Sequence, residues 1–211
     1  MAGTNIAVLG AGNIGGTLGR KWTGAGNSVT FGVTDANGQH AQAIRADLGN
    51  QAAIGTIAEA LADAEVAVFA IPGPKMAETI AANASALSGK LVIDAANRMG
   101  EQTANSLDDF RRHAPSVRYV RAFNTLGWEN FADPLFDGVA ADLIYAGPEA
   151  DRPLVERLIS EIGLHPVWLG DADQASTVDS LLRVWFALAI QRGQGRHLAF
   201  KVLSRRQSAG G

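Results

Sequence analysis

Three glycines near the start of the chain have the spacing of a phosphate-binding turn. Gly10, Gly12 and Gly15 form the pattern G-x-G-x-x-G directly after the apolar run 6–9. In a strand–turn–helix unit the first glycine permits a tight turn, the second lets the backbone approach a pyrophosphate, and the third lets the helix pack on the strand. The helix N-terminus adds unpaired N–H groups and a partial positive charge. The predicted pyrophosphate-binding residues of a dinucleotide site are therefore Gly10, Ala11, Gly12, Asn13, Ile14 and Gly15.

The residues that follow the second predicted strand, 28–33, bear on which dinucleotide is bound. NAD-binding proteins usually carry an acidic residue at the end of this strand, where it accepts a hydrogen bond from the ribose 2′-hydroxyl. Val33 stands at that position, Asp35 comes two residues later, and there is no arginine near Thr34 such as NADP-binding proteins usually have. The missing acid and the hydroxyl of Thr34 favour NADP, and NAD stays open.

Rigid or polar residues follow three other predicted strands. The strand 66–70 leads into Ile71-Pro72-Gly73-Pro74, which could wall a cofactor cleft, although a stiff turn explains it equally well. Asn97 and Asn124 each come just after a strand, where an amide could hydrogen bond a carboxamide or a ribose. Capping of the next helix is the better explanation for Asn97 taken alone.

Residue sets typical of side-chain catalysis are missing from the sequence. The four histidines do not cluster with carboxylates, so we expect no metal site, and no nucleophile motif is present. No lysine or histidine stands where a dehydrogenase needs a proton donor. Hydride transfer between two bound ring systems needs no such group, because the protein then supplies alignment alone. We therefore predict no catalytic side chain.

The composition is that of a globular domain with a sizeable core. The 211 residues are 47% hydrophobic and 18% charged, and the net charge of −3 gives no reason to expect nucleic acid as a partner. The absence of cysteine excludes disulfides and thiolate chemistry and suits a reducing cytoplasm. The longest apolar stretch, 184–190, is far shorter than the roughly 20 residues that span a bilayer, and no targeting segment is visible, so we expect a soluble protein without membrane contact.

Short apolar runs alternate with amphipathic segments along most of the chain. This alternation predicts an α/β fold of the Rossmann type, a doubly wound parallel sheet, with a small C-terminal helical extension. We expect a dinucleotide-binding domain at 1–125 and a C-terminal segment at 126–211, together one compact unit, with a frayed tail from 204. Strands are expected at 6–9, 28–33, 53–54, 66–70, 91–93, 117–120, 142–146 and 166–169, and helices at 13–25, 39–48, 57–62, 76–87, 107–113, 128–131, 154–162 and 172–191.

Taken together, these segments resemble the coenzyme F420-dependent NADP oxidoreductase family. The likeness covers nearly the whole chain and is carried by residues 6–15, 29–32, 92–97, 121–125 and 193–195. It implies that NADPH binds to the N-terminal domain, that the C-terminal part helps to form a cleft for the deazaflavin, and that hydride passes directly between the two rings. By the same resemblance, Val33 and Thr34 face the adenosine 2′-substituent. The further cofactor-binding residues predicted are Ala70, Ile71, Pro72, Ala96, Asn97, Ala122 and Asn124.

The second substrate is expected beside the last long helix. Leu182, Trp185 and Phe186 could contact a tricyclic ring, and Arg196 could meet an anionic tail. Alternatively, the aromatic stripe is core or a dimer interface and the arginines are a solvated face. We expect a homodimer, because a long apolar C-terminal helix on a small domain usually finds a partner surface. Three functions stay open: a nicotinamide:deazaflavin oxidoreductase, an NAD(P)H-dependent reductase of another planar acceptor such as a flavin, quinone or imine, and a non-catalytic dinucleotide sensor.

Overall fold

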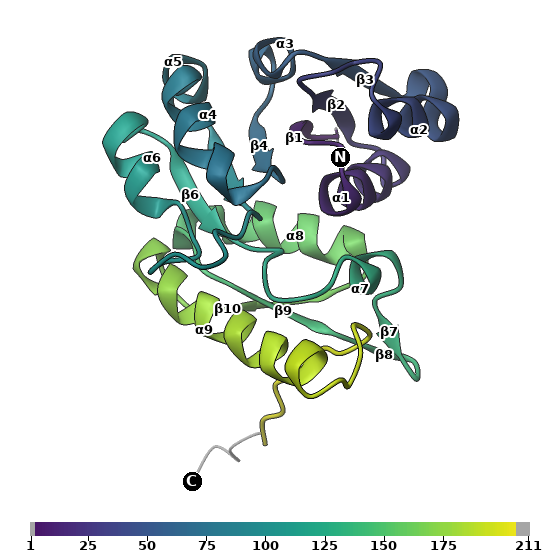
Figure 1. Ribbon diagram of the computed structural model, residues 1–211, viewed down its shortest axis with the longest axis vertical. Coiled ribbons are helices and arrows are strands. Elements are labelled where there is room, and N and C mark those ends of the chain that lie inside the picture. The colour runs from purple at the N-terminus through teal and green to yellow at the C-terminus, as the bar shows by residue number, and fades with distance from the viewer. Residues whose placement is uncertain (1–2, 206–211) are drawn as a thin grey trace, which may run out of the picture.

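The computed structural model describes residues 3–205, and the part of the expected tail at 206–211 lies outside the described residues. Its centre is a six-stranded parallel sheet with strand order β3-β2-β1-β4-β5-β6 (Figure 1). The predicted Rossmann-type fold is confirmed. The strands of this sheet are β1 (Asn5–Leu9), β2 (Ser28–Gly32), β3 (Ala52–Gly55), β4 (Val66–Phe69), β5 (Leu91–Asp94) and β6 (Arg118–Arg121).

Helices cover both faces of this sheet because its strands are apolar on both sides. In β1, Ile6 and Val8 pack into one buried cluster and Ala7 and Leu9 into another. The first cluster includes residues of α1 (Asn13–Gly24) and α2 (Gln39–Leu48), and the second those of the helices that follow β3, β4 and β5. The helices of the second face are α3 (Ile57–Ala62), α4 (Met76–Ala82), α5 (Ala84–Leu87) and α6 (Leu107–His113).

The C-terminal segment contacts the first helix of the N-terminal part. The indole Nε1 of Trp22 in α1 donates to the carbonyl of Leu158 in α8 over 2.9 Å, so the two helices are joined in the first cluster. The strands β9 (Asp142–Tyr145) and β10 (His165–Trp168) form a separate two-stranded parallel sheet, which is drawn below the six-stranded sheet in Figure 1. The α-helices and strands of the C-terminal segment are α7 (Glu129–Ala132), β7 (Leu135–Phe136), β8 (Val139–Ala140), β9 (Asp142–Tyr145), α8 (Arg152–Ile162), β10 (His165–Trp168) and α9 (Ala175–Phe186).

Three local features differ from the sequence prediction. The helix expected at 76–87 is divided at Asn83, whose amide donates to the carbonyl of Thr79 over 2.8 Å and so competes with the helical backbone. The hairpin of β7 and β8 was not predicted because each strand has only two residues, although the Asp137-Gly138 turn, with φ of 50° and 82°, is a strong hairpin signal. The segment expected as one helix at 172–191 is a 3-10 turn (η4, Ala172–Gln174), then α9, and finally a π-helix (η5, Ala187–Gln191).

Within 3–205, no group of three or more histidine or acidic side chains is arranged to hold a metal ion. Over the same residues, every helix is too short or too polar to cross a membrane.

Candidate dinucleotide-binding site

The glycine turn between β1 and α1 has the geometry that its sequence predicts. Gly10 adopts φ of +99°, in the left-handed region that favours glycine, and a β-carbon there would lie 2.5 Å from the carbonyl oxygen of Ala70. A β-carbon on Gly15 would lie 2.0 Å from the carbonyl oxygen of Gly10. Gly12, in contrast, has nothing within 4 Å of its added β-carbon. The first and third glycines therefore serve packing, whereas the second borders open space.

The N-terminus of α1 is suited to an anion. Gly12 is its N-cap residue, and no side chain caps it. The first turn carries no acidic residue that would repel a phosphate. The first N–H groups of a helix have no intrahelical partner and carry the positive end of the helix dipole, so they can donate to phosphate oxygens. The open space beside Gly12 is where such a group fits.

A cavity of about 930 Å³ opens at this turn. It lies over the carboxyl ends of β1, β2 and β4, at the point between β1 and β4 where the strand order reverses, and ligands bind at this point in open α/β sheets. Its volume is in the range of ligand pockets. The residues that line it are Gly10, Ala11, Gly12, Asn13, Ile14, Gly32, Val33, Thr34, Asp35, Gly38, Gln39, His40, Ala41, Ile57, Ala70, Ile71, Pro72, Lys75, Glu78, Thr79, Ala82, Asn83 and Trp128.

One end of this cavity is formed by the loop after β2. Val33 and Thr34 line it there, as does Asp35. Asp35 Oδ1 accepts a hydrogen bond from the backbone N–H of Asn37 over 2.9 Å, so this carboxylate stabilises the turn in which it lies. The loop ends at Gly38, which starts α2 without a capping side chain, and a second helix N-terminus thereby faces the same end of the cavity.

Several lining residues were not found from the sequence. Gln39 and His40, in the first turn of α2, could have been found by treating that helix N-terminus like the first one. Lys75 and Glu78 form an exposed ion pair of 3.1 Å at the start of α4. Trp128 comes from the C-terminal segment, where no repeated pattern marks it, so only the fold could bring it to this cavity.

The predicted nicotinamide-side residues fall into two groups. Ala70, Ile71 and Pro72 line the large cavity, whereas the four residues after β5 and β6 do not. Of these four, Asn97 is next to the Pro72 loop, since a β-carbon on Gly73 would lie 2.5 Å from its carbonyl oxygen. The four residues are Ala96, Asn97, Ala122 and Asn124.

A buried ion cluster lies beneath these strand ends. Arg121, at the end of β6, has a fully buried side chain that contacts Asp94 over 3.3 Å and Asp179 of α9 over 2.7 Å. Burial raises the pKa of Asp94, and Arg121 opposes that effect. Burial alone would lower the pKa of Arg121, but the charges of Asp94 and its neighbours outweigh this and raise it. Arg121 therefore stays charged, and α9 is tied to the sheet through it.

The turn that follows β6 is strained and tightly packed. Phe123 has φ of 60°, which a residue other than glycine rarely adopts. Its ring packs edge-on against Trp22 and Phe131, with centroid distances of 5.6 and 5.7 Å. The turn leaves the Asn124 amide donating to Asp179 over 3.1 Å, while Asn124 Oδ1 is buried without a partner in the described residues.

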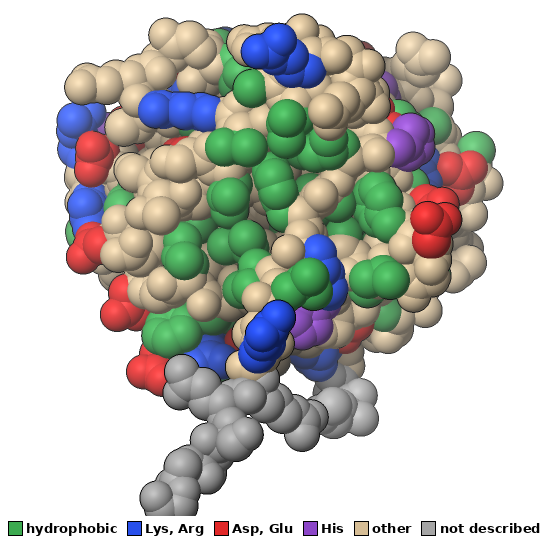
Figure 2. Space-filling model, turned by 90° about the horizontal axis from the view of Figure 1, so that it is seen from below, with side chains coloured by type: hydrophobic (Ala, Val, Ile, Leu, Met, Phe, Trp, Pro, Cys, Tyr) green, Lys and Arg blue, Asp and Glu red, His purple; other side chains and the backbone are tan. Residues whose placement is uncertain are grey.

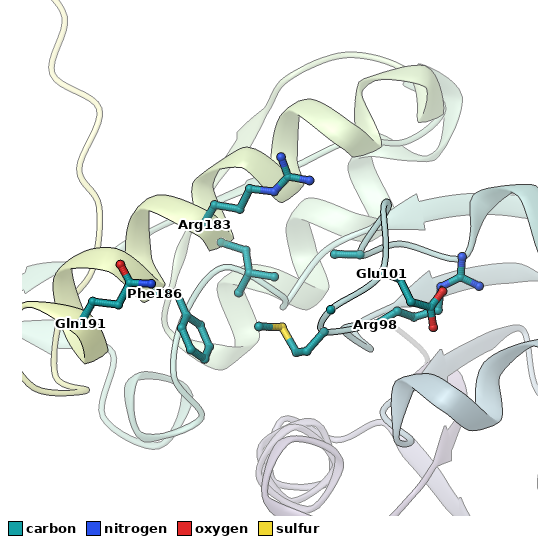
Figure 3. A pocket seen from close by; sticks show the side chains of 9 residues that line it. Arg98, Glu101, Arg183, Phe186 and Gln191 are labelled. Atoms are coloured by element: carbon teal, nitrogen blue, oxygen red, sulfur yellow. The ribbon is translucent and has the colours of Figure 1, made fainter.

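Only two of the four predicted second-substrate residues line a cavity. Leu182 and Phe186 line a smaller cavity of about 260 Å³ between α9 and the loop after Asn97. In Figure 3 the Phe186 ring lies beside this loop. The guanidinium of Arg183 donates to the loop, at the carbonyl of Gln102, over 3.3 Å. The residues that line the smaller cavity are Arg98, Met99, Gly100, Glu101, Ala104, Leu182, Arg183, Phe186 and Gln191.

Trp185 and Arg196 are used elsewhere. The Trp185 side chain is buried, and its indole Nε1 donates to the carbonyl of Leu198 over 2.8 Å. Arg196 pairs with Glu129 over 2.5 Å and lies over the Trp185 ring. These contacts are those of a packed C-terminal segment, which is the alternative that the sequence left open for the aromatic stripe.

Part of the chain matches a known protein family. Residues 5–98, somewhat less than half of the chain, match the family described as NADP oxidoreductase, coenzyme F420-dependent, so the expected resemblance is confirmed for the part that contains the glycine turn. A protein from Arthrobacter sp. FB24, described as a candidate F420-dependent NADP-reductase, has a crystal structure with 25% identity and a TM-score of 0.81, and the match covers 96% of this chain and 100% of that one.

More distant solved structures share the fold. A hypothetical protein from Sinorhizobium meliloti has 24% identity and a TM-score of 0.68, with 96% of each chain covered. An imine reductase from Pseudomonas sp. has 19% identity and a TM-score of 0.69, with 90% of this chain and 64% of that chain covered. No curated protein matches the chain.

Proposed function

We propose that this protein is an NADPH-dependent oxidoreductase that transfers a hydride between nicotinamide and a deazaflavin of the F420 type. The observation that carries the proposal is the open space at Gly12, where an uncapped helix N-terminus meets a cavity of about 930 Å³. The family match over residues 5–98 contains this turn and supports the same chemistry. Bound dihydronicotinamide supplies the hydride from its C4, and a proton from water completes the reduction of the deazaflavin.

NADPH is the coenzyme that the loop after β2 favours. Val33 leaves the strand end without an acid for a ribose 2′-hydroxyl, and Asp35 is engaged with Asn37. The uncapped start of α2 and the hydroxyl of Thr34 can instead donate hydrogen bonds to a 2′-phosphate. NADH is the alternative, with Asp35 as its ribose ligand.

The acceptor ring is proposed to approach from the smaller cavity. This cavity begins at Arg98, one residue after Asn97, so it continues the nicotinamide side of the site. Leu182 and Phe186 give it an apolar wall for a planar ring. At about 260 Å³ it is smaller than most ligand pockets, so a deazaflavin would insert only part of its ring system and leave its tail at the surface. Arg183 and Arg192 are exposed there and could pair with an anionic tail.

The small volume also favours a second candidate, a reductase of another planar acceptor, because a quinone or an imine is smaller than the three fused rings that flavins and deazaflavins share. Such an enzyme would use the same coenzyme site. Its acceptor would fit within the smaller cavity.

Calorimetric titration with NADPH and NADH, followed by stopped-flow absorbance with each acceptor, tests these proposals. The deazaflavin proposal requires tighter binding of NADPH and oxidation of bound NADPH by the deazaflavin. Turnover with a quinone or an imine but not with the deazaflavin would select the second candidate, and turnover with free flavin alone would also contradict the deazaflavin proposal. Tight binding without hydride transfer to any acceptor would make the protein a nucleotide sensor.

A homodimer is proposed to form through the outer side of α9 and η5. Val184 and Ile190 are 47% and 44% exposed on these two elements. Figure 2 views the molecule from the side of α9, and apolar side chains spread across the centre of that face, with most charges toward its margins. Sedimentation at micromolar concentration should give twice the mass of the chain for the wild type. The Val184→Glu variant should sediment with the mass of one chain.

A further inference from the structure

The amide of Asn97 has a fixed polarity. Arg121 Nη2 lies 2.7 Å from Asn97 Oδ1. A guanidinium can only donate hydrogen bonds, so the oxygen of the amide must face Arg121 and the nitrogen must face the other way. The orientation thus follows from chemistry and does not depend on how the two similar amide atoms are assigned.

Arg121 is itself unable to turn. Its Nη1 donates to the carbonyl of Ala96 over 2.5 Å and its Nε donates to Asp179 over 2.8 Å. The side chain is fully buried, and Asp94 contributes a second carboxylate. With the guanidinium held on three sides, the amide of Asn97 has no alternative position for its oxygen that keeps this contact.

The nitrogen of the same amide is available to a ligand. Asn97 Nδ2 donates one hydrogen, over a long 3.3 Å, to the carbonyl of Asn124. Within residues 3–205, no acceptor takes the second hydrogen. Asn97 is half-buried and lines neither cavity, but its neighbours do. Its carbonyl contacts Gly73, the residue after Pro72 of the large cavity, and the next residue in the chain, Arg98, lines the smaller one. The group that it offers there is an N–H donor only.

We propose that Asn97 Nδ2 donates a hydrogen bond to the carboxamide oxygen of the nicotinamide, and that Arg121 is the positioning residue that fixes this polarity. The inference rests on the proposed function, because it assumes that a nicotinamide ring lies between the two cavities. A ring in that position brings its carboxamide beside Asn97. An acceptor oxygen is the complement of a lone donor.

The test compares NADPH with its thionicotinamide analogue, in which sulfur, a poorer acceptor, replaces the carboxamide oxygen. Dissociation constants are measured by calorimetry for the wild type and for Asn97→Asp. The substitution keeps size and the contact with Arg121 but removes the donor. We expect the wild type to bind the analogue about 3- to 10-fold more weakly than NADPH, and Asn97→Asp to bind both about equally, with NADPH affinity about 10-fold lower.

Two further variants separate the donor from charge and from structure. Asn83→Asp places the same new charge on the wall of the large cavity and should leave the analogue-to-NADPH ratio unchanged. Arg121→Lys keeps the positive charge but cannot contact Asn97 and Asp179 at the same time. The ratio of the dissociation constant of the analogue to that of NADPH should therefore fall towards the value for Asn97→Asp. If Arg121→Lys does not fold, Asn97→Asp decides alone.

The proposal is overturned if Asn97→Asp melts like the wild type and keeps its full preference for the oxygen compound, or if the wild type shows no preference. Failure of the wild type to bind either coenzyme would instead contradict the proposed function. The two failures are therefore distinguishable.

Discussion

Gly15 of α1 lies against the carbonyl oxygen of Gly10 so closely that a β-carbon on Gly15 would be 2.0 Å from it. The contact sets the distance between the first helix and the first strand, and through it the position of the helix N-terminus over the cavity. Gly12, midway between them, makes no such contact. The glycines of one motif can therefore be separated by experiment.

Replacing Gly12 with valine should abolish dinucleotide binding and leave the fold intact. Its φ of −68° is accessible to any residue, and the added atoms would enter open space where the pyrophosphate is proposed to lie. We expect a loss of NADPH affinity of at least about 100-fold in calorimetry, with Tm within about 2 °C of the wild type. Gly15→Val is the matched control, because its β-carbon clashes with the backbone and should lower Tm instead. Undiminished affinity in Gly12→Val would refute the site.

Replacing Val33 with aspartate should change the coenzyme preference from NADPH towards NADH. The new carboxylate would stand at the end of β2, where it can accept a hydrogen bond from a ribose 2′-hydroxyl and would repel a 2′-phosphate. We expect the ratio of the two dissociation constants to change by about 10- to 100-fold. Thr34→Ser, which keeps the hydroxyl, serves as the control. An unchanged ratio in Val33→Asp would mean that the 2′-substituent lies elsewhere.

Replacing Phe186 with alanine should weaken the acceptor and spare the coenzyme. The ring is half-buried and lines the smaller cavity, so its loss removes a flat apolar wall. Steady-state kinetics should show KM for the acceptor raised about 10-fold and the NADPH dissociation constant within about twofold of the wild type. Trp185→Phe should behave differently, since it loses the hydrogen bond to Leu198 and should lower Tm. Equal effects on both substrates in Phe186→Ala would argue against two separate subsites.

Acid should loosen the C-terminal segment around Lys201 and Val202, which contacts Asp142. Burial alone would raise the pKa of Asp142, but hydrogen bonds from Lys201 Nζ and from the backbone N–H of Val202, each 2.6 Å long, outweigh it and hold the pKa below its usual range. A carboxyl whose pKa is lowered by folding stabilises the protein above its unfolded pKa, about 3.9, and this stabilisation is lost as pH falls through the folded value.

Asp142→Asn should therefore lower Tm by about 3–6 °C at pH 6.5 and by much less at pH 3. Differential scanning calorimetry at the two pH values measures this. Asp47→Asn removes an exposed ion pair with Arg20 and should change Tm little at either pH. A difference for Asp142→Asn that is the same at both pH values would contradict the proposed role of its charge.

Local pattern was sufficient for the sheet and its phosphate turn. Runs such as 66–69 are apolar at every position because both faces of a parallel strand are covered, and the glycine pattern depends only on neighbours within six residues. Trp128 and the Asp179–Arg121 pair could not be found in the same way. Arg121 and Asp179 are 58 residues apart in the chain, and only the packing of α9 on the sheet brings them together. The rings of Trp185 and Phe186 pack against each other, with centroids 6.0 Å apart, but only Phe186 borders the smaller cavity, and their shared helical stripe could not predict that difference.

The wide final turn of α9, the π-helix η5, decides the shape of the smaller cavity. Phe186 and Gln191 both line it although they are five residues apart. In an α-helix of 3.6 residues per turn, five residues advance about 1.4 turns and would carry Gln191 well off the face of Phe186. In a π-helix each residue hydrogen bonds to the fifth one before it, so there are more residues per turn and the angle between successive residues is smaller. A homologue shorter by one residue at this point would regain ordinary helical phase and lose one wall of the pocket, so a single insertion or deletion could exchange one acceptor for another without altering a side chain.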